Sequence, residues 1–374
     1  MSKLVLKNGY LIDKSERLLR VQKDVLVIDG LIRKIGDNID EKDAEVIDCT
    51  GLFVAPGFID MHVHVFQKSE RLGVRADRVG VESGVTTVCD AGTAGPENIG
   101  EFVEDVIKKS KTRVFSSMHF AKQGLVVVPE ADSEDKYDFD LAKKKFYEYQ
   151  QYICAIKARA SNSTVGALGI KPIAEAAKFA NEIDMPLYVH IGRPLPYIEE
   201  VCEALNKGDI ITHTYHGKEV NWILRDGKVK KELLDAKAKG VLFDVGHGKE
   251  SFNFKCAEVA FKEGFIPDTI STDLHIKNVD GPVYTLALTM DKMIAMGLSL
   301  EDVVEMVTAK PAQAFKFSVP IGKLKVGYCG DFTIFKVEEG HYDYEDSDGN
   351  PLTGTKKIVP TCAIVGGKVE MKKW

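Results

Sequence analysis

Short segments in which hydrophobic and polar residues alternate occupy the first 53 positions and return near the carboxyl end of the chain. Alternation with a period of two is typical of strands that have one buried face. Gly, Asn and Asp residues, which favour turns, separate these segments. Because chain termini often lie close together, we expect residues 1–53 and 316–374 to combine into one small β-sandwich domain.

Between these segments, residues 54–315 follow a different rhythm. Hydrophobic runs of β-strand length alternate with longer segments that have apolar residues three or four positions apart, as in KPIAEAAKFANEI. This alternation is typical of βα units around a parallel sheet. We identify eight runs, from GFIDMHVHV at residue 57 to DTISTDLHI at residue 268. Eight strands over about 260 residues predict a (β/α)8 TIM barrel.

Composition and charge narrow the class of protein. The chain of 374 residues is 44% hydrophobic and 28% charged, which is ordinary for a globular protein. Its net charge of -6 provides no basic field for a phosphate backbone, so we expect no nucleic-acid partner. The amino terminus has no long apolar run, so we expect neither a signal peptide nor a membrane span.

The cysteines indicate the compartment. Their number, seven, is odd, and their wide spacing includes no CxxC pair, which argues against a disulfide framework and a thiolate zinc site. We expect reduced, mostly buried cysteines in a cytoplasmic protein.

Polar residues stand at the ends of several predicted strands, where the active sites of such barrels lie. These residues are His62, His64, Lys157, Arg159, His190, His213, Asp273 and His275. His62 and His64 are two positions apart on a strand and therefore share a face. Imidazole and carboxylate ligands suit Zn and its first-row neighbours. One HxH pair is a weak signal, but the whole set predicts a metal site with room for a water.

The segments PGFIDMHVH, YVHIG, ITHTYHG and STD, together with the lysine of the fourth run, resemble the amidohydrolase superfamily of metal-dependent hydrolases. The resemblance covers essentially the whole chain. Four segments are also similar to the branch of dihydroorotase-like amidohydrolases and deacetylases, namely IKARASNSTVG, HIGRP, THTYHG and FDVGHG.

This resemblance implies a binuclear centre. His62, His64 and Asp273 would bind one divalent ion, expected to be Zn, and His190 and His213 would bind the second. Lys157 would bridge them as a carboxylated lysine, since a desolvated neutral amine can add carbon dioxide. The alternative for Lys157 is an ordinary lysine that pairs with a carboxylate.

The implied reaction is attack by a metal-bridging hydroxide on an amide or ester of a small carboxylate-bearing substrate. Cyclic amides, N-acyl acids and O-acyl acids all fit. Asp273 would act as general acid and base, with a purely structural carboxylate as the alternative. A purine-type deaminase of the same superfamily and a non-catalytic barrel that serves as a binding or assembly module are the other hypotheses. A homo-oligomer is compatible with each of them.

Candidate substrate-binding residues follow from position. Arg159 lies two residues beyond Lys157 on the same strand face, and Arg193 closes the fifth run, so either could clamp a carboxylate. Surface arginines that pair with acidic neighbours are the alternative. His216, His247 and His275 lie at or beyond strand ends, and any of them could bind substrate or an oxyanion. His275 is favoured because it shares a face with Asp273.

Overall fold

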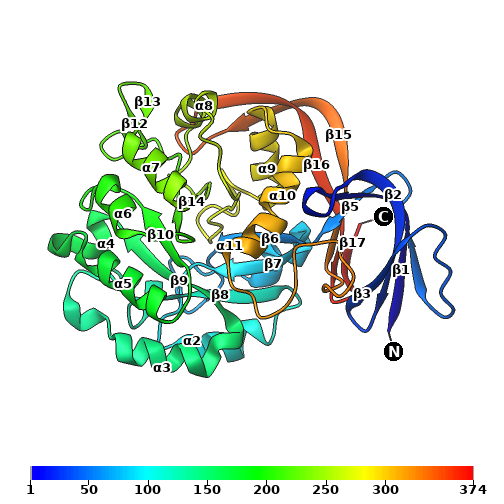
Figure 1. Cartoon of the computed structure of the whole chain (residues 1–374), viewed down its shortest axis with the longest axis horizontal. Coiled ribbons are helices and arrows are strands. Elements are labelled where there is room, and N and C mark those ends of the chain that lie inside the picture. Colours follow the sequence, from blue (N-terminus) through cyan, green and yellow to red (C-terminus); the bar gives the residue numbers. More distant parts are fainter. Residues whose placement is uncertain (1, 374) are drawn as a thin grey trace.

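The computed structural model describes residues 2–373, and its terminal strands form one eight-stranded sheet (Figure 1). The strand order is β17-β16-β15-β5-β1-β2-β3, and β4 pairs with β1. The strands are β1 (Lys3–Asp13), β2 (Leu18–Ile28), β3 (Leu31–Gly36), β4 (Glu45–Asp48), β5 (Phe53–Pro56), β15 (Phe332–Glu345), β16 (Pro351–Val365) and β17 (Lys368–Lys372). One buried cluster takes Leu11 and Val25 from the amino-terminal strands and Phe332 and Ile364 from the carboxyl-terminal ones. The two ends of the chain therefore share a core, as the alternating pattern predicted.

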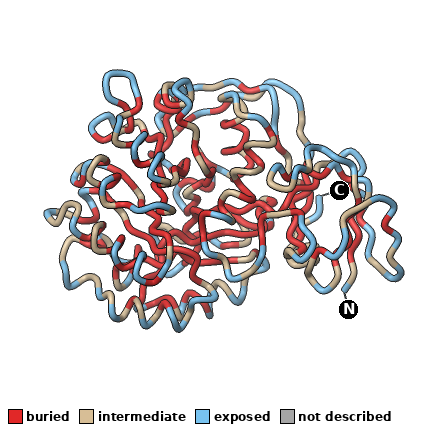
Figure 2. The backbone as a smooth tube through the Cα atoms, in the orientation of Figure 1, coloured by how far each residue is buried: buried red, intermediate tan, exposed pale blue. Residues whose placement is uncertain are grey.

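A second, fully parallel sheet forms the barrel, in the order β14-β11-β10-β9-β8-β7-β6. Its strands are β6 (Phe58–Val63), β7 (Val85–Asp90), β8 (Arg113–His119), β9 (Ile153–Ala160), β10 (Leu187–Ile191), β11 (Ile210–Thr212) and β14 (Leu242–Phe243). These strands are almost entirely buried, which explains their continuous hydrophobic runs (Figure 2). A two-stranded ribbon, β12 (Leu224–Arg225) with β13 (Lys228–Val229), projects from the outer surface.

Helices surround this sheet (Figure 1). They are α1 (Ala76–Val79), α2 (Ile99–Phe102), α3 (Phe139–Tyr149), α4 (Asn162–Val165), α5 (Lys171–Glu182), α6 (Ile198–Ala204), α7 (Lys231–Lys239), α8 (Phe254–Lys262), α9 (Leu286–Ala295), α10 (Leu300–Met306) and α11 (Ala309–Ala314). In α5, the apolar residues three or four positions apart form one buried face, which contains Ile173, Ala176, Ala177 and Ala180.

The eighth predicted run, DTISTDLHI, departs from the expectation of a regular strand. It makes only two isolated parallel bridges, between Asp244 and Thr269 on one side and between Val63 and Leu274 on the other. Asp273 has a φ of 54°, in the left-handed region, which interrupts the extended backbone. The run still lies between β14 and β6 and takes the place of the eighth strand, so the architecture is a TIM barrel.

The hairpin of β15 and β16 extends beyond the terminal sheet and reaches the barrel near α8 (Figure 1). At its tip, Ser347 donates its backbone N–H to the Phe252 carbonyl at 3.0 Å, and Asp346 accepts the Phe254 N–H at 2.8 Å. Further along the hairpin, the Ile358 N–H donates to Asp291 on α9 at 2.7 Å. The hairpin thus fixes the segment that precedes α8. The division of the chain at residues 53 and 316 stays a prediction.

Two further expectations concern cysteines and membranes. All seven cysteines, which lie within residues 2–373, are free, and six of them are buried. None of the helices in that range is long and apolar enough to cross a membrane.

Candidate active site

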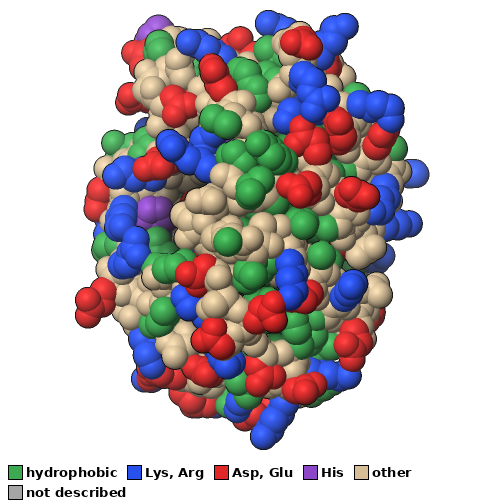
Figure 3. All heavy atoms as spheres, turned by 90° about the vertical axis from the view of Figure 1, so that its left-hand side faces the viewer, with side chains coloured by type: hydrophobic (Ala, Val, Ile, Leu, Met, Phe, Trp, Pro, Cys, Tyr) green, Lys and Arg blue, Asp and Glu red, His purple; other side chains and the backbone are tan. Residues whose placement is uncertain are grey.

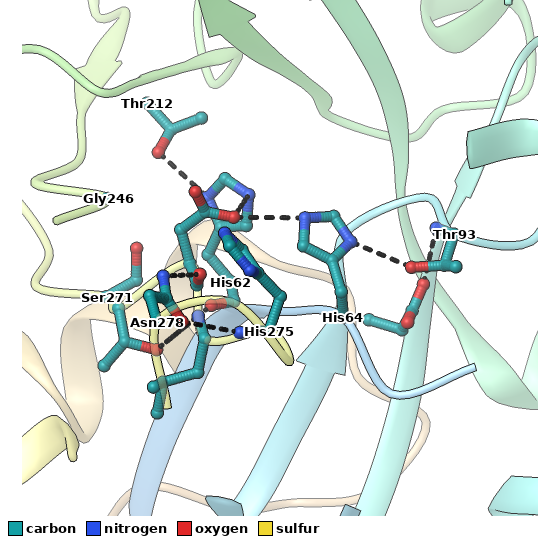
Figure 4. A network of polar contacts seen from close by, with 12 residues as sticks. His62, His64, Thr93, Thr212, Gly246, Ser271, His275 and Asn278 are labelled. Carbon is teal, nitrogen blue, oxygen red and sulfur yellow. Dashed lines mark hydrogen bonds and ion pairs between the residues drawn. The ribbon is translucent and has the colours of Figure 1, made fainter. Parts of the chain in front are cut away.

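A cavity of about 370 Å³ opens where the barrel strands end, and the predicted residues line it. Those at its wall are His62, His64, Lys157, Arg159, His190, Asp273 and His275. His213 lies behind them, with its ring 4.5 Å from that of His190 and 5.0 Å from that of His62. Figure 4 shows His62, His64 and His275 converging, with Thr93 against His64. The carboxyl ends of five different parts of the barrel therefore meet at one point.

Asp273 stands at the centre of the histidines. Its Oδ1 lies 3.1 Å from His64 Nε2 and 3.4 Å from His62 Nε2. Ligand atoms of His62, His213 and Asp273 all lie within 4.8 Å of one another. Nitrogen and carboxylate atoms at this spacing can bind a single divalent cation.

The hydrogen bonds behind His62 fix its tautomer. Its Nδ1 lies 3.0 Å from the Tyr188 hydroxyl and 3.1 Å from Thr212 Oγ1. Both hydroxyls donate their own hydrogens to Asp244 Oδ2, each at 2.7 Å. They can therefore only accept from His62, so its Nδ1 carries the proton. Its Nε2 is left with a lone pair that faces the Asp273 carboxylate, an arrangement that a cation between them would satisfy.

His213 and His64 also have hydrogen-bond partners at Nδ1. His213 Nδ1 lies 2.6 Å from the Gly246 carbonyl, which can only accept, so the lone pair is on Nε2. That Nε2 is buried and has no partner within residues 2–373. His64 Nδ1 lies 2.8 Å from the Thr93 hydroxyl, and the Thr93 backbone N–H donates to Asp90. With its Nδ1 on Thr93, His64 directs Nε2 at Asp273 Oδ1, so the Nε2 atoms of all three histidines are placed to act as metal ligands.

Burial keeps the imidazoles of His62 and His213 neutral, as metal ligation requires. Burial lowers the pKa of His213 to about 3, although the nearby Asp273 opposes the shift. Burial and the nearby Lys157 hold the pKa of His62 well below its ordinary value.

Lys157 is fully buried in β9, and its amine has no hydrogen-bond partner among residues 2–373. The Nζ lies 4.2 Å from the centre of the Tyr188 ring. Burial lowers the pKa of the Lys157 amine to about 7, even though Asp273 attracts its charge. A large fraction of the amine is therefore neutral near pH 7. Within the described chain no carboxylate oxygen lies within 4.0 Å of it, so the structure does not show the ordinary ion-paired lysine that was the alternative.

Two glycines leave room for these groups. A Cβ at Gly92, which has a φ of 81°, would lie 2.6 Å from Lys157 Cγ. A Cβ at Gly248, with a φ of 59°, would lie 2.8 Å from Asp273 Oδ2. Any other residue at either position would combine a strained backbone with a steric clash.

The backbone is itself unusual at two of the candidate ligands, because His213 and Asp273 have φ values of 68° and 54°. Such conformations cost of order 1 kcal/mol in non-glycine residues and occur often at functional sites. Asn278 stabilises the left-handed conformation at Asp273. Its side chain donates a hydrogen bond to the Asp273 carbonyl and accepts one from the His275 N–H, each at 2.8 Å.

The candidate substrate-binding residues separate into two groups. Arg159 and His275 line the cavity, and Arg193 lines a second cavity of about 630 Å³ that adjoins it. His216 and His247 line neither. His216 Nδ1 accepts the Lys218 N–H, and His247 Nε2 accepts a hydrogen bond from the buried Lys292 amine at 2.8 Å.

Arg159 occupies an intermediate position. Its Nη1 lies 3.3 Å from Glu130 Oε1, and its side chain retains 20% of its exposure. Glu130 is buried and neither of its carboxylate oxygens has a hydrogen-bond partner within residues 2–373. Arg159 therefore does pair with an acidic neighbour, as the alternative for this residue expected, but the pair lies at the wall of the cavity.

Sequence reasoning missed the residues behind the site, chiefly Tyr188, Thr212 and Asp244 with Thr93 and Asn278. Asp244 shows how complete this network is, because Tyr188, Thr212, Thr269 and Ser271 all donate hydroxyl hydrogens to it. The available signal was a carboxylate inside the hydrophobic run GVLFDVGHG. A buried acid in such a run requires several donors.

Comparison with known proteins agrees with this geometry. A family model for the amidohydrolase family matches residues 53–369. A deacetylase of Enterococcus faecalis is 37% identical over 371 residues, which cover 98% of both chains. Among solved structures, one described as an adenine deaminase superposes with a TM-score of 0.93 at 36% identity, over 100% of both chains. One described as a dihydroorotase gives 0.91 at 30% identity, over 100% of this chain and 98% of the other.

The match covers far more than half of the chain and includes every element that surrounds the cavity. The parallel barrel, the histidines at the strand ends, and β5, β15 and β16 of the terminal sheet all fall within it. We conclude that the chain is a hydrolytic enzyme that belongs to the amidohydrolase family.

Proposed function

We propose that this enzyme is a binuclear metal-dependent hydrolase of an amide or ester bond in a small carboxylate-bearing substrate. His62, His64 and Asp273 would hold one divalent ion, and His190 and His213 the second. Lys157, carboxylated on its amine, would bridge the two. The observation that carries the proposal is the convergence of imidazole nitrogens on one carboxylate: His62 and His64 Nε2 lie 3.4 and 3.1 Å from Asp273 Oδ1, and ligand atoms of His62, His213 and Asp273 lie within 4.8 Å of one another. Ions bound there, with zinc as our expectation, would lower the pKa of a water and polarise the scissile carbonyl.

The residues of the chain supply the other steps. Asp273 lines the cavity, so its carboxylate can hold a proton from the attacking water and return it to the leaving nitrogen or oxygen. Its rigid backbone, fixed by Asn278, keeps the carboxylate in place through both transfers. Arg159 lines the same cavity, and Glu130 orients its guanidinium. This guanidinium can donate two hydrogen bonds to a substrate carboxylate.

The relatives support this choice of reaction. The Enterococcus protein is described as a deacetylase and one structural neighbour as a dihydroorotase, and hydrolysis of an acyl bond fits both names. Purine-type deamination is the second candidate, favoured by the 36% identity to the protein described as an adenine deaminase. Against it stands the buried Lys157 amine, which has no hydrogen-bond partner in the described part of the chain and suits a bridging ligand between two ions. A non-catalytic module would have no need for all six candidate ligands.

A hydrolysis screen tests the proposal. The metal-loaded enzyme should release acid from at least one member of a set of hydantoins, dihydroorotate, N-acyl D- and L-amino acids and acyl hydroxy acids. Adenine and related purines form the second arm, with ammonia as the measured product. Ammonia release without turnover of any acyl compound would replace the proposal with the deaminase. A cytoplasmic location and a homo-oligomeric state remain predictions from the sequence.

Arg159→Met should selectively lower kcat/KM for acidic substrates. Loss of a charge-assisted bidentate contact in a desolvated site costs about 2 to 4 kcal/mol, so kcat/KM should fall roughly thirty-fold to a thousand-fold. Neutral ester or amide analogues of the same substrate should change little. Steady-state kinetics on matched acidic and neutral substrates measure this. An equal loss on both would show that Arg159 acts on the fold of the site through Glu130 rather than on the substrate.

A further inference from the structure

The candidate active site continues outward into the second cavity. The two share Arg159, His190, Asp273 and His275 in their walls, so they form one cleft that runs from the histidines to the surface. Five cationic side chains line the outer part, namely Arg159, Arg193, Lys218, Lys249 and Lys277. The acidic side chains there are Glu250 and Asp273. This excess of positive charge contrasts with the net charge of -6 of the whole chain.

Apart from Arg159, which pairs with Glu130, these cations are also unusual because they have no ion-pair partner among residues 2–373. Elsewhere on the surface many lysines and arginines pair with a carboxylate, as Lys108 does with Glu104 and Arg75 with Glu82. Among residues 2–373, no carboxylate oxygen lies within 4.0 Å of the side-chain nitrogens of Arg193, Lys218, Lys249 or Lys277. Basic side chains gather beside a histidine at one edge of the face in Figure 3, where acidic ones are otherwise interspersed.

Lys218 is a cation of the outer cavity that is held in place by a hydrogen bond within the cleft wall. It is half-buried, and its Nζ donates to the Glu250 carbonyl at 2.7 Å, so it links the loop after β11 to the loop after β14. Burial lowers the pKa of this amine, and the nearby carboxylate of Glu250 opposes the shift. Placing a cation there costs desolvation that no carboxylate contact offsets. An anionic group of the ligand would supply the missing partner.

We propose that the natural substrate carries a second anionic group, a phosphate or a carboxylate, which the outer cavity binds through Arg193, Lys218 and Lys249. This inference rests on the proposed function only because it calls the bound ligand a substrate; the anion-binding site itself does not depend on that function. The first carboxylate would lie on Arg159, and the reacting bond would lie beside Asp273. Clefts lined by one sign of charge concentrate ligands of the opposite sign and raise their association rates.

Calorimetric binding of pairs of ligands that differ in one anionic group tests the proposal. In each pair, the member with two anionic groups is called the dianion and the member with one is called the monoanion. We would compare 3-phosphoglycerate with glycerate, and glutarate with its monomethyl ester. The dianion of at least one pair should bind about tenfold more tightly than its monoanion, and the advantage should shrink as ionic strength rises. The phosphate pair and the carboxylate pair distinguish the two kinds of anionic group.

Variants identify where the second charge binds. Arg193→Met with Lys249→Met, two exposed positions, should remove most of the dianion advantage, so that the two members of each pair bind about equally. The matched control is Lys255→Met with Lys262→Met on α8, which removes two exposed cations that line no part of the cleft and should leave the dianion advantage unchanged. Dianions and monoanions that bind alike in both pairs would overturn the proposal, as would a dianion advantage that survives in the cleft variant. Because the readout is binding, these results stand apart from any failure of the hydrolysis screen.

Discussion

Replacing Asp273 with Asn should reduce turnover by about 100-fold or more on any substrate that the enzyme hydrolyses. The substitution keeps the shape of the side chain and one oxygen that can act as a ligand, but the amide cannot take a proton from the attacking water. A positioned general acid and base typically contributes a factor of this size. Metal content should fall less than activity, because His62 and His64 remain.

The measurement is kcat, together with the metal content of the same preparation. Asp280→Asn is the matched control, since Asp280 is an exposed carboxylate that follows the same segment and pairs with Arg78. Its kcat should be unchanged. Near-normal turnover in Asp273→Asn with metal still bound would remove the acid and base role and leave Asp273 as a structural ligand.

Lys157→Ala should lose both bound metal and activity. Without a carboxylated amine, the two ions have no bridging anionic ligand from the protein. The buried alanine would also leave a cavity beneath Tyr188, into which a small carboxylic acid can fit. Adding acetate or propionate should therefore restore part of the metal and part of the activity.

Metal analysis and activity at increasing concentrations of the acid test this result. Lys292→Met serves as the control, because Lys292 is also fully buried but lines neither cavity of the cleft. It should keep its metal, with thermal unfolding used to confirm that the variant is folded. A Lys157→Ala variant that retains two ions per chain would contradict the bridging role.

The sequence predicted most of the barrel because parallel strands buried on both faces must be continuously hydrophobic. The run DTISTDLHI takes the place of the eighth strand but does not have the regular backbone of the others. Its left-handed residue, Asp273, is held by a hydrogen bond from the Asn278 side chain to the Asp273 carbonyl, which the hydrophobic pattern does not indicate. The long hairpin escaped prediction for a related reason, because its contacts with the segment before α8 join residues almost one hundred positions apart.

The candidate ligands were predictable for a different reason. A histidine or lysine in an apolar strand is conspicuous in a sequence, and the carboxyl ends of parallel strands meet in space. The groups that set the tautomer of His62 were not conspicuous, since Tyr188 and Thr212 are ordinary residues in a strand. The same limit applies to His216 and His247, whose place in the sequence resembles that of His275 although neither reaches the cavity wall.

The most direct test of the binuclear centre is elemental analysis of the wild-type enzyme after purification from metal-supplemented medium. The ligand set His62, His64, Lys157, His190, His213 and Asp273 predicts about two divalent ions per chain, since that number and type of ligand completes two shells that stay open to water. A stoichiometry that remained near zero under these conditions would contradict the binuclear account.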